Sequence, residues 1–379
     1  MSFDRLQTII DKMKNPTVVG LDPDIENIPP EILERHISEK GETLEAAAAA
    51  AFEFNTGLID TLCDIVPAVK PQSAFYEAFG PEGVLALKRT CGYAKSKGMY
   101  VICDGKRNDI GSTVSAYSAA YLGAVKVGSR ELRPFDFDAL TVNAYLGSDG
   151  LRSFIETSVK YDKAVFVLLK TSNASAGELQ DMYISEREDA DVNTNSRCTN
   201  GSMEGGSGDA VEGGSGDAVE GGSGDAAEDA AEDAVEGAAE GGSECNAENC
   251  SGGKANSGLK NMKTLYTAVG DLVEELAIQT TGKYGYTRAG AVVGATYPEE
   301  IVFLRNRLRY TFFLVPGYGA QGGSATDVAC AFDGEGRGAI VNSSRAIIAA
   351  WKKTGGDYQA AAREEALKMR DALQAALRK

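Results

Sequence analysis

Histidine is almost absent from this chain, since His36 is the only one among 379 residues. Ser-His-Asp and Cys-His mechanisms need a histidine base, and histidine clusters are common metal ligands. His36 itself lies in the polar sequence Glu-Arg-His-Ile-Ser-Glu, which is typical of a helix surface. Any acid–base chemistry is therefore expected to use lysine, aspartate, glutamate or tyrosine.

Cysteine offers no framework either, because none of the seven cysteines forms a Cys-x-x-Cys pair. Four of them lie in apolar or helical contexts, where a free thiol behaves as a small hydrophobic group: Cys63, Cys91, Cys103 and Cys330. The sequence predicts neither a disulfide framework nor a zinc site, and this indicates a reducing compartment.

Long apolar runs and clusters of basic residues are also missing. No stretch of about 18 apolar residues occurs, and the opening Met-Ser-Phe-Asp-Arg-Leu has no signal-like apolar region. A nucleic-acid surface would need clustered lysine and arginine. We therefore expect a cytoplasmic protein that has neither membrane nor nucleic acid as a partner.

Acidic charge is abundant but is concentrated in one segment. The formal net charge is -17, yet residues 201–250 hold 14 Asp or Glu and no Lys or Arg, which leaves 41 acidic against 38 basic residues elsewhere. Glu204, Glu212 and Glu220 each open an octapeptide of the type Glu-Gly-Gly-Ser-Gly-Asp-Ala-Val. Such units cannot bury an apolar face and lack the calcium-loop pattern. We expect residues 187–257 to be a disordered acidic insert, and residues 1–186 and 258–379 to form one folded domain.

Outside the insert, short runs rich in β-branched residues alternate with helical segments. Eight runs read as strands: Thr17–Asp22, Pro67–Lys70, Met99–Asp104, Ala139–Asn143, Ala164–Lys170, Ala291–Ala295, Thr311–Pro316 and Ala339–Ser343. The helical segments are Leu44–Ile65, Pro81–Lys97, Ser115–Val127, Leu151–Tyr161, Leu259–Thr280, Glu299–Leu308 and Tyr358–Leu377. This alternation predicts an α/β protein of the (β/α)8 TIM-barrel type, with the insert after the fifth strand.

The strand at residues 99–104 runs directly into charged residues. Asp104 and Lys106 are two apart, so regular alternation would point both side chains to one side of the strand. Asp109 lies beyond the strand and could face a neighbouring subunit. A D-x-K-x-x-D string on its own is more often a surface ion pair than a site.

Other strand ends favour a site, because barrel enzymes keep their chemistry where the strands end. The residues at those ends are Asp22, Lys70 with Gln72, Asn143, and Ser172. A glycine-rich loop containing Gln321 follows the seventh strand, and Arg345 follows the eighth. Free backbone N–H groups, an amide and a guanidinium make a phosphate cradle.

These motifs together resemble the orotidine 5′-phosphate decarboxylase family, specifically its long-chain members from bacteria and some protists. The resemblance covers roughly residues 1–186 and 258–379. Its motifs are Gly20-Leu-Asp-Pro-Asp24, Lys70-Pro-Gln-Ser-Ala-Phe-Tyr-Glu77, Asp104-Gly-Lys-Arg-Asn-Asp-Ile110, Lys170-Thr-Ser-Asn173, Pro316-Gly-Tyr-Gly-Ala-Gln321 and Ser344-Arg345.

The resemblance implies decarboxylation of orotidine 5′-monophosphate to uridine 5′-monophosphate without cofactor or metal. Lys106 would stabilise charge at ring carbon C6 and deliver the proton, and Asp104 would hold Lys106 in place. Lys70 would extend the charged row. The partner subunit of a homodimer would add Asp109 and Thr113.

The resemblance also implies roles for the remaining candidates. Asp22 would bind ribose hydroxyls, Ser172 the pyrimidine amide edge, and Gln321 with Arg345 the phosphate. Gln72 and Asn143 are weaker candidates for substrate binding, and Ala174–Asp181 would form a lid.

Two alternatives remain open at the level of the sequence. One is a metal-dependent sugar-phosphate decarboxylase or aldolase of the same superfamily, although such relatives carry a magnesium-binding carboxylate where this chain has Lys70. The other is a non-catalytic binder of nucleotide phosphates. A binder has no use for a costly row of charges in its pocket.

Overall fold

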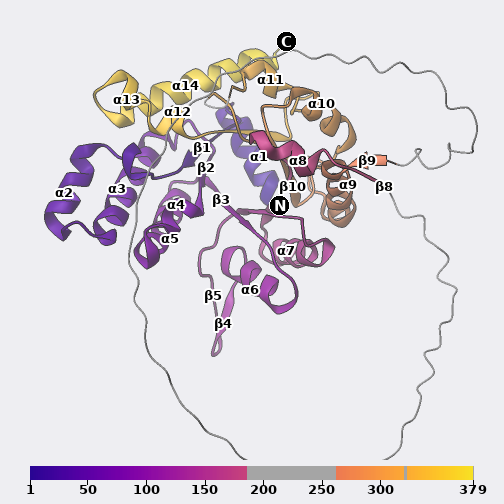
Figure 1. Ribbon diagram of the computed structural model, residues 1–379, viewed down its shortest axis with the longest axis horizontal. Coiled ribbons are helices and arrows are strands. Elements are labelled where there is room, and N and C mark those ends of the chain that lie inside the picture. Colours follow the sequence, from indigo (N-terminus) through magenta and orange to yellow (C-terminus); the bar gives the residue numbers. More distant parts are fainter. Residues whose placement is uncertain (186–261, 320–321, 379) are drawn as a thin grey trace, which may run out of the picture. The chain divides into compact units, whose positions relative to one another are not determined.

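Eight parallel strands close into a barrel at the centre of the protein (Figure 1). The computed structural model describes residues 1–185, 262–319 and 322–378, so the expected disorder of 187–257 lies outside the described residues. The barrel strands, in spatial order, are β1 (Thr17–Leu21), β2 (Ala68–Pro71), β3 (Tyr100–Arg107), β6 (Ala139–Val142), β7 (Ala164–Lys170), β10 (Ala289–Val293), β11 (Phe313–Val315) and β12 (Ala339–Ser343). All eight predicted strands are confirmed, and so is the TIM-barrel class.

Strand alternation divides the core into two layers. Val18, Ile102 and Ile340 belong to a cluster that fills the barrel, whereas Val19 and Val101 belong to the cluster between the strands and the surrounding helices. Both faces of a barrel strand are buried, which explains why the runs are apolar throughout instead of alternating. The barrel closes where β1 pairs with β12.

Helix α1 (Ser2–Met13), which the sequence analysis did not predict, packs against the inner cluster through Phe3, Leu6 and Ile10. Seven helices overlap the predicted ones: α3 (Leu44–Leu62), α5 (Gly80–Ser96), α6 (Gly111–Tyr121), α7 (Ser148–Tyr161), α9 (Leu265–Ala277), α10 (Pro298–Arg307) and α14 (Tyr358–Leu377). The other helices are α2 (Pro30–Lys40), α4 (Ser73–Glu77), α8 (Gly177–Gln180), α11 (Ala325–Ala329), α12 (Arg345–Ile348) and α13 (Trp351–Thr354). No helix in the described ranges is long and apolar enough to cross a membrane.

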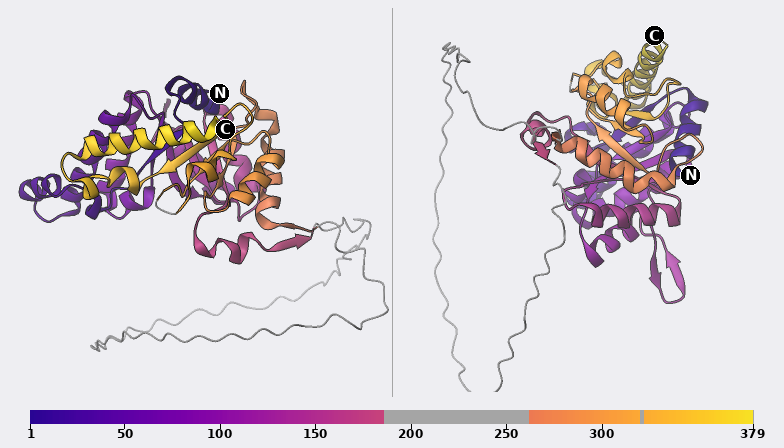
Figure 2. Two further views of the ribbon diagram at one scale, coloured as in Figure 1. Left: turned by 90° about the horizontal axis from the view of Figure 1, so that it is seen from above. Right: turned by 90° about the vertical axis from the view of Figure 1, so that its right-hand side faces the viewer.

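Two short antiparallel ribbons differ from the predicted helices. Residues 125–127, predicted as the end of a helix, form β4 (Val125–Val127), which pairs with β5 (Arg130–Leu132) in a hairpin that projects from the barrel (Figure 2). Gly128 turns this hairpin with a positive φ of 61°, which glycine adopts without strain. The second ribbon joins β8 (Tyr183–Ser185) to β9 (Met262–Thr264), so α9 begins later than predicted.

Candidate active site

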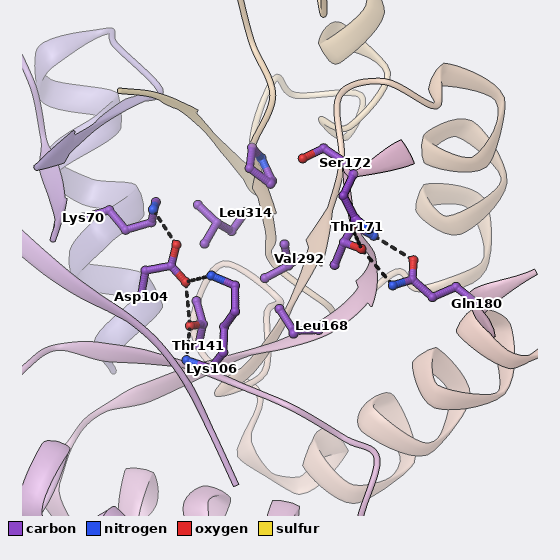
Figure 3. Close-up of a pocket in the computed structure, with 12 residues that line it drawn as sticks. Lys70, Asp104, Lys106, Thr141, Leu168, Thr171, Ser172, Gln180, Val292 and Leu314 are labelled. Atoms are coloured by element: carbon purple, nitrogen blue, oxygen red, sulfur yellow. Dashed lines mark hydrogen bonds and ion pairs between the residues drawn. The ribbon is translucent and has the colours of Figure 1, made fainter. Parts of the chain in front are cut away.

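A row of three charged side chains lies where β2 and β3 end (Figure 3). Lys70 Nζ donates to Asp104 Oδ2 at 2.6 Å, and Lys106 Nζ donates to Asp104 Oδ1 at 2.7 Å. Thr141 Oγ1 donates to the same Oδ1 at 2.9 Å. Asp104 therefore has each carboxylate oxygen matched to one ammonium, and the predicted pair of Asp104 and Lys106 is formed.

Burial and charge act in opposite directions on this row. Burial raises the pKa of Asp104, but the charges of Lys70 and Lys106 outweigh it and hold that pKa well below its usual range. Burial lowers the pKa of Lys70, but the charges of Asp104 and Asp22 outweigh it and the net pKa is raised. Asp104 and Lys70 are therefore both charged at neutral pH.

Lys106 is aimed by an irregularity in the strand. Its φ is 47°, a left-handed conformation that is uncommon outside glycine, and the pairing of β3 with β6 shifts register between Cys103 and Arg107. Thr141 Oγ1 also accepts a hydrogen bond from Lys106 N at 3.0 Å. Lys106 and Asp104 meet as regular alternation predicts, but the position of Lys106 depends on a bulge in β3 that a hydrogen bond to Thr141 holds.

The row forms one wall of a cavity of about 390 Å³. Leu168, Val292 and Leu314 supply apolar side chains to its lining, and Thr171, Ser172 and Gln180 supply polar ones (Figure 3). The Lys106 side chain is 45% exposed, whereas that of Lys70 is 5% exposed. Lys106 is therefore the ammonium that a ligand in this cavity would meet.

Helix α8 lies beside this cavity and is tied to the end of β7. Gln180 Oε1 accepts from Thr171 N at 2.9 Å, and Gln180 Nε2 donates to Thr171 Oγ1 at 2.8 Å. The fully buried Lys170 forms an ion pair with Asp181 and lies 4.4 Å from the ring centre of Tyr297. This segment is the one that the sequence analysis expects to act as a lid.

A second cavity, of about 190 Å³, shares Lys70, Asp104, Ser172 and Pro316 with the first. Its other lining residues are Asp22, Gln72, Gly317, Tyr318, Asn342, Ser344 and Arg345. Because the two cavities share four lining residues, they are adjoining halves of one pocket. One half is floored by apolar side chains and the other is lined by polar ones.

Asp22 lies in the polar half with an incomplete set of partners. Its Oδ1 atom is buried and accepts no hydrogen bond from the described residues. Burial raises the pKa of Asp22, although the charge of Lys70 and a hydrogen bond from Ser344 oppose that rise. A carboxylate in this state is suited to accept hydrogen bonds from a ligand.

The structure brings together seven of the predicted site residues. Those that line one or both cavities are Lys70, Asp104, Lys106, Asp22, Gln72, Ser172 and Arg345. Gln321 lies outside the described residues. Asp109, Thr113 and Asn143 line neither cavity of their own chain.

Asn143 instead supports a turn, because its Oδ1 accepts from Tyr145 N at 2.8 Å and its carbonyl accepts from Asn108 Nδ2 at 2.5 Å. Thr113 is exposed on α6. Asp109 lies between β3 and α6 and accepts a hydrogen bond from Ile110 N at 2.8 Å. Thr141 and Asn342 were not predicted as site residues, although both lie at barrel-strand ends, where they could have been found. Gln180 was predicted only as part of the lid segment.

The fold and the site define a class of protein, a TIM-barrel enzyme whose lysine and aspartate side chains meet at the C-terminal ends of the strands. In the described part of the chain, no group of three or more His, Cys, Asp or Glu residues could hold a metal ion.

Comparison with known proteins gives the particular family. Residues 18–205 match the orotidine 5′-phosphate decarboxylase / HUMPS family. An orotidine 5′-phosphate decarboxylase of Rhodopirellula baltica is 37% identical over 92% of this chain and 88% of its own. The protein of the same name from Clostridium acetobutylicum is 32% identical over the whole of both chains. This chain belongs to the orotidine 5′-phosphate decarboxylase family.

Solved structures agree with this assignment. The structure of Leishmania donovani OMP decarboxylase aligns with a TM-score of 0.58 at 25% identity and covers 98% of both chains. That of Plasmodium berghei orotidine 5′-monophosphate decarboxylase aligns with a TM-score of 0.63 at 16% identity and covers 98% of both chains, which shows a shared fold.

Proposed function

We propose that this protein decarboxylates orotidine 5′-monophosphate to uridine 5′-monophosphate in pyrimidine biosynthesis. Membership of the family supports the reaction, since relatives that carry this name align over nearly the full chain. The observation that carries the proposal within the structure is the ion-paired row of Lys70, Asp104 and Lys106 beside a cavity with an apolar floor.

We assign the chemical step to Lys106. Loss of the carboxylate leaves electron density at C6 of the pyrimidine with no conjugated group to receive it, so a cation placed there beforehand stabilises the transition state. Lys106 is the exposed ammonium of the row, and its one described anionic partner is Asp104. The same ammonium would then donate the proton that replaces the carboxylate.

Asp104 would keep Lys106 charged and in place, and Lys70 would keep Asp104 charged. This division of roles fits the geometry, because Lys70 is buried behind the carboxylate while Lys106 faces the cavity. Asp104 would also stand close to the departing substrate carboxylate, so that like charges repel in the bound state.

The adjoining cavities suggest how the substrate is oriented. The pyrimidine would lie over Leu168, Val292 and Leu314, with Ser172 at its amide edge. Asp22, with Gln72 as a weaker candidate, would bind the ribose, and Arg345 would bind the phosphate together with Gln321. A guanidinium beside glycine-rich backbone suits a phosphate.

A homodimer with shared sites would explain Asp109 and Thr113, which line neither cavity of their own subunit. Exposed apolar residues lie nearby along the chain: Ile110 is 55% exposed and Val127, on the β4–β5 hairpin, is 59% exposed. On the same hairpin, Val125 pairs with Leu132 and both are exposed, and apolar residues that gather on a surface in this way favour a protein interface. A two-fold dimer would place each Asp109 at the partner's row.

Mixing two inactive variants tests the shared site. A mixed dimer of Lys106→Ala and Asp109→Asn chains holds one site in which both residues are intact, provided that Asp109 acts across the interface. Random exchange should therefore restore about a quarter of the wild-type activity. If Asp109 acts within its own chain, every site stays damaged and no activity returns.

We further propose that residues 1–186 and 258–379 form the catalytic domain. In support, Ser185 and Met262, the described residues nearest to the intervening segment, pair with each other in an antiparallel ribbon. We also propose that the protein acts in the cytoplasm, because Cys63, Cys91, Cys103 and Cys330 are free thiols.

Absorbance-monitored decarboxylation of orotidine 5′-monophosphate in the presence of EDTA tests the proposed function. Rapid turnover would support it and would show that no readily chelated metal is needed. Activity on a sugar phosphate that appears only after magnesium is added would move the protein to the metal-dependent relatives. Binding of nucleotide without any turnover would favour the non-catalytic alternative.

A further inference from the structure

Asn342 is a polar residue at a buried position of a barrel strand, where apolar residues are usual. It lies on β12, two residues after Ile340 of the barrel interior, and its relative exposure is 8%. It lines the smaller cavity, and its Oδ1 atom accepts no hydrogen bond from the described residues. Its Nδ2 atom donates to Ser344 Oγ at 3.4 Å.

This arrangement costs stability unless a ligand completes it. A buried acceptor without a donor destabilises the folded chain, and a β-branched apolar residue would suit a strand better. An amide at this position is therefore explained by something that enters the cavity.

The same cavity holds a second buried acceptor that lacks a hydrogen-bond donor among the described residues. Asp22 Oδ1 is also buried without a described partner, and a hydrogen bond from Ser344 acts on Asp22. Ser344 thus lies between Asp22 and Asn342. The neighbouring strand makes room for it, because a Cβ on Gly20 would lie 1.8 Å from Ser344 Oγ.

The chemistry of these groups selects their ligand. Two acceptors that lack donors require a ligand that donates hydrogen bonds, and sugar hydroxyls do so. A phosphate dianion has no proton to donate, and Arg345 in the same cavity offers it a guanidinium instead.

We propose that Asn342 binds substrate by accepting a hydrogen bond from a ribose hydroxyl, beside Asp22. The proposal rests on the proposed function, because it takes the ligand to be a ribonucleotide. It assigns to Asn342 a part in telling ribose from deoxyribose.

Equilibrium binding of uridine 5′-monophosphate and of its 2′-deoxy and 3′-deoxy analogues tests this role. In the wild type, the loss of the hydroxyl that Asn342 reads should weaken binding roughly tenfold. In Asn342→Ala, the affinity for the full nucleotide should fall by a similar factor, and the discrimination against one of the two analogues should disappear. Unchanged discrimination against both analogues would overturn the proposal.

Two further variants keep the test decisive. Asn55→Ala is the matched control, because Asn55 is also buried with an unpartnered Oδ1 but lies on α3 and lines neither cavity; it should retain both discriminations. Asn342→Val removes the acceptor while suiting a strand, and it replaces Asn342→Ala if that variant does not fold.

The outcomes separate this proposal from the proposed function. Wild-type protein that binds the nucleotides but does not decarboxylate orotidine 5′-monophosphate would refute the function, and the analogue series would still test Asn342. Wild-type protein that decarboxylates, with discrimination unchanged in the Asn342 variants, would refute only the role of Asn342.

Discussion

The two ends of the barrel carry nearly the same arrangement of charges. At the C-terminal end, Lys70 and Lys106 lie 2.6 and 2.7 Å from Asp104. At the N-terminal end, Lys95 and Lys163 lie 2.6 and 2.7 Å from Asp136. Opposing lysine charges hold the pKa of both aspartates well below the usual range, although burial acts to raise it.

The clusters differ in what surrounds them. The N-terminal cluster is closed by Asp138, which is ion-paired with Arg5 of α1 and accepts from Val101 N at 3.0 Å. The Lys163 side chain is 4% exposed, and none of these residues lines the two cavities at the opposite end. An ion-paired lysine is therefore no mark of a site on its own. The distinguishing feature is an ammonium that faces an open cavity.

The largest expected effect comes from removing that ammonium. Lys106→Ala should lower kcat by about 10⁴-fold or more, because it removes both the cation and the proton donor. Affinity for uridine 5′-monophosphate should change less than tenfold, and the midpoint of thermal unfolding should change little. Steady-state kinetics, calorimetry of product binding and thermal melts measure the three quantities; near-wild-type turnover would contradict the assignment.

The opposite pattern is expected at the N-terminal end. Asp138→Asn leaves Arg5, Lys95 and Lys163 short of a buried counterion, so the free energy of unfolding should fall by about 3 kcal/mol. kcat of the folded protein should stay within about twofold, since structure at this face contributes stability. Denaturant unfolding and low-temperature kinetics test this; a kcat loss without a stability loss would erase the contrast between the ends.

The contributions of Asp22 and Asp136 to stability should depend on pH in opposite ways, because their pKa values are shifted in opposite directions. The lowered pKa of Asp136 contributes stability above its unfolded pKa, and that contribution is lost as pH falls through the folded pKa. The raised pKa of Asp22 costs stability at neutral pH, and that cost vanishes as pH falls through the folded pKa.

Asp136→Asn should therefore destabilise the unliganded protein at pH 7, and this effect should shrink below the usual pKa of an aspartate but still be present at pH 3. Asp22→Asn should instead stabilise the unliganded protein at pH 7. Asp22→Asn should also weaken binding of uridine 5′-monophosphate roughly tenfold or more. Unfolding free energies measured from pH 3 to 7 and product titrations check both signs; destabilisation by Asp22→Asn at pH 7 would show that its burial is compensated.

The smallest effect is expected from removing the acidic residues of the insert, which belong to neither cluster. Replacing residues 187–257 by a short linker should change kcat/KM less than about twofold and leave the dimer intact, because Ser185 and Met262 already pair across the edges. Kinetics and the mass of the assembly measure this. A large fall in kcat/KM in a folded deletant would show that the acidic segment influences the site.

The sequence predicted the barrel and seven of the residues that line the two cavities, because both depend on local patterns. Apolar runs mark the strands, and charged residues such as Asp104 and Lys106 follow directly after one of them. The bulge at Lys106 and the hydrogen bonds of Thr141 could not be predicted, since they depend on the register between β3 and β6. The β4–β5 hairpin was missed because Val125 and Val127 continue an apolar helical pattern until the positive φ of Gly128 reverses the chain.

The position of α8 determines whether the buried Lys170 has a counterion. Its buried ammonium has Asp181, at the end of α8, as its ion-pair partner, with the rings of Tyr297 and Tyr266 as neighbours. If α8 moves away, the ammonium of Lys170 loses Asp181 as its counterion and must be hydrated at the same time. Intermediate positions, in which the ammonium has neither a counterion nor water, are high in free energy. On these contacts we expect α8 to occupy two main positions, one docked against Lys170 and one displaced with that ammonium hydrated.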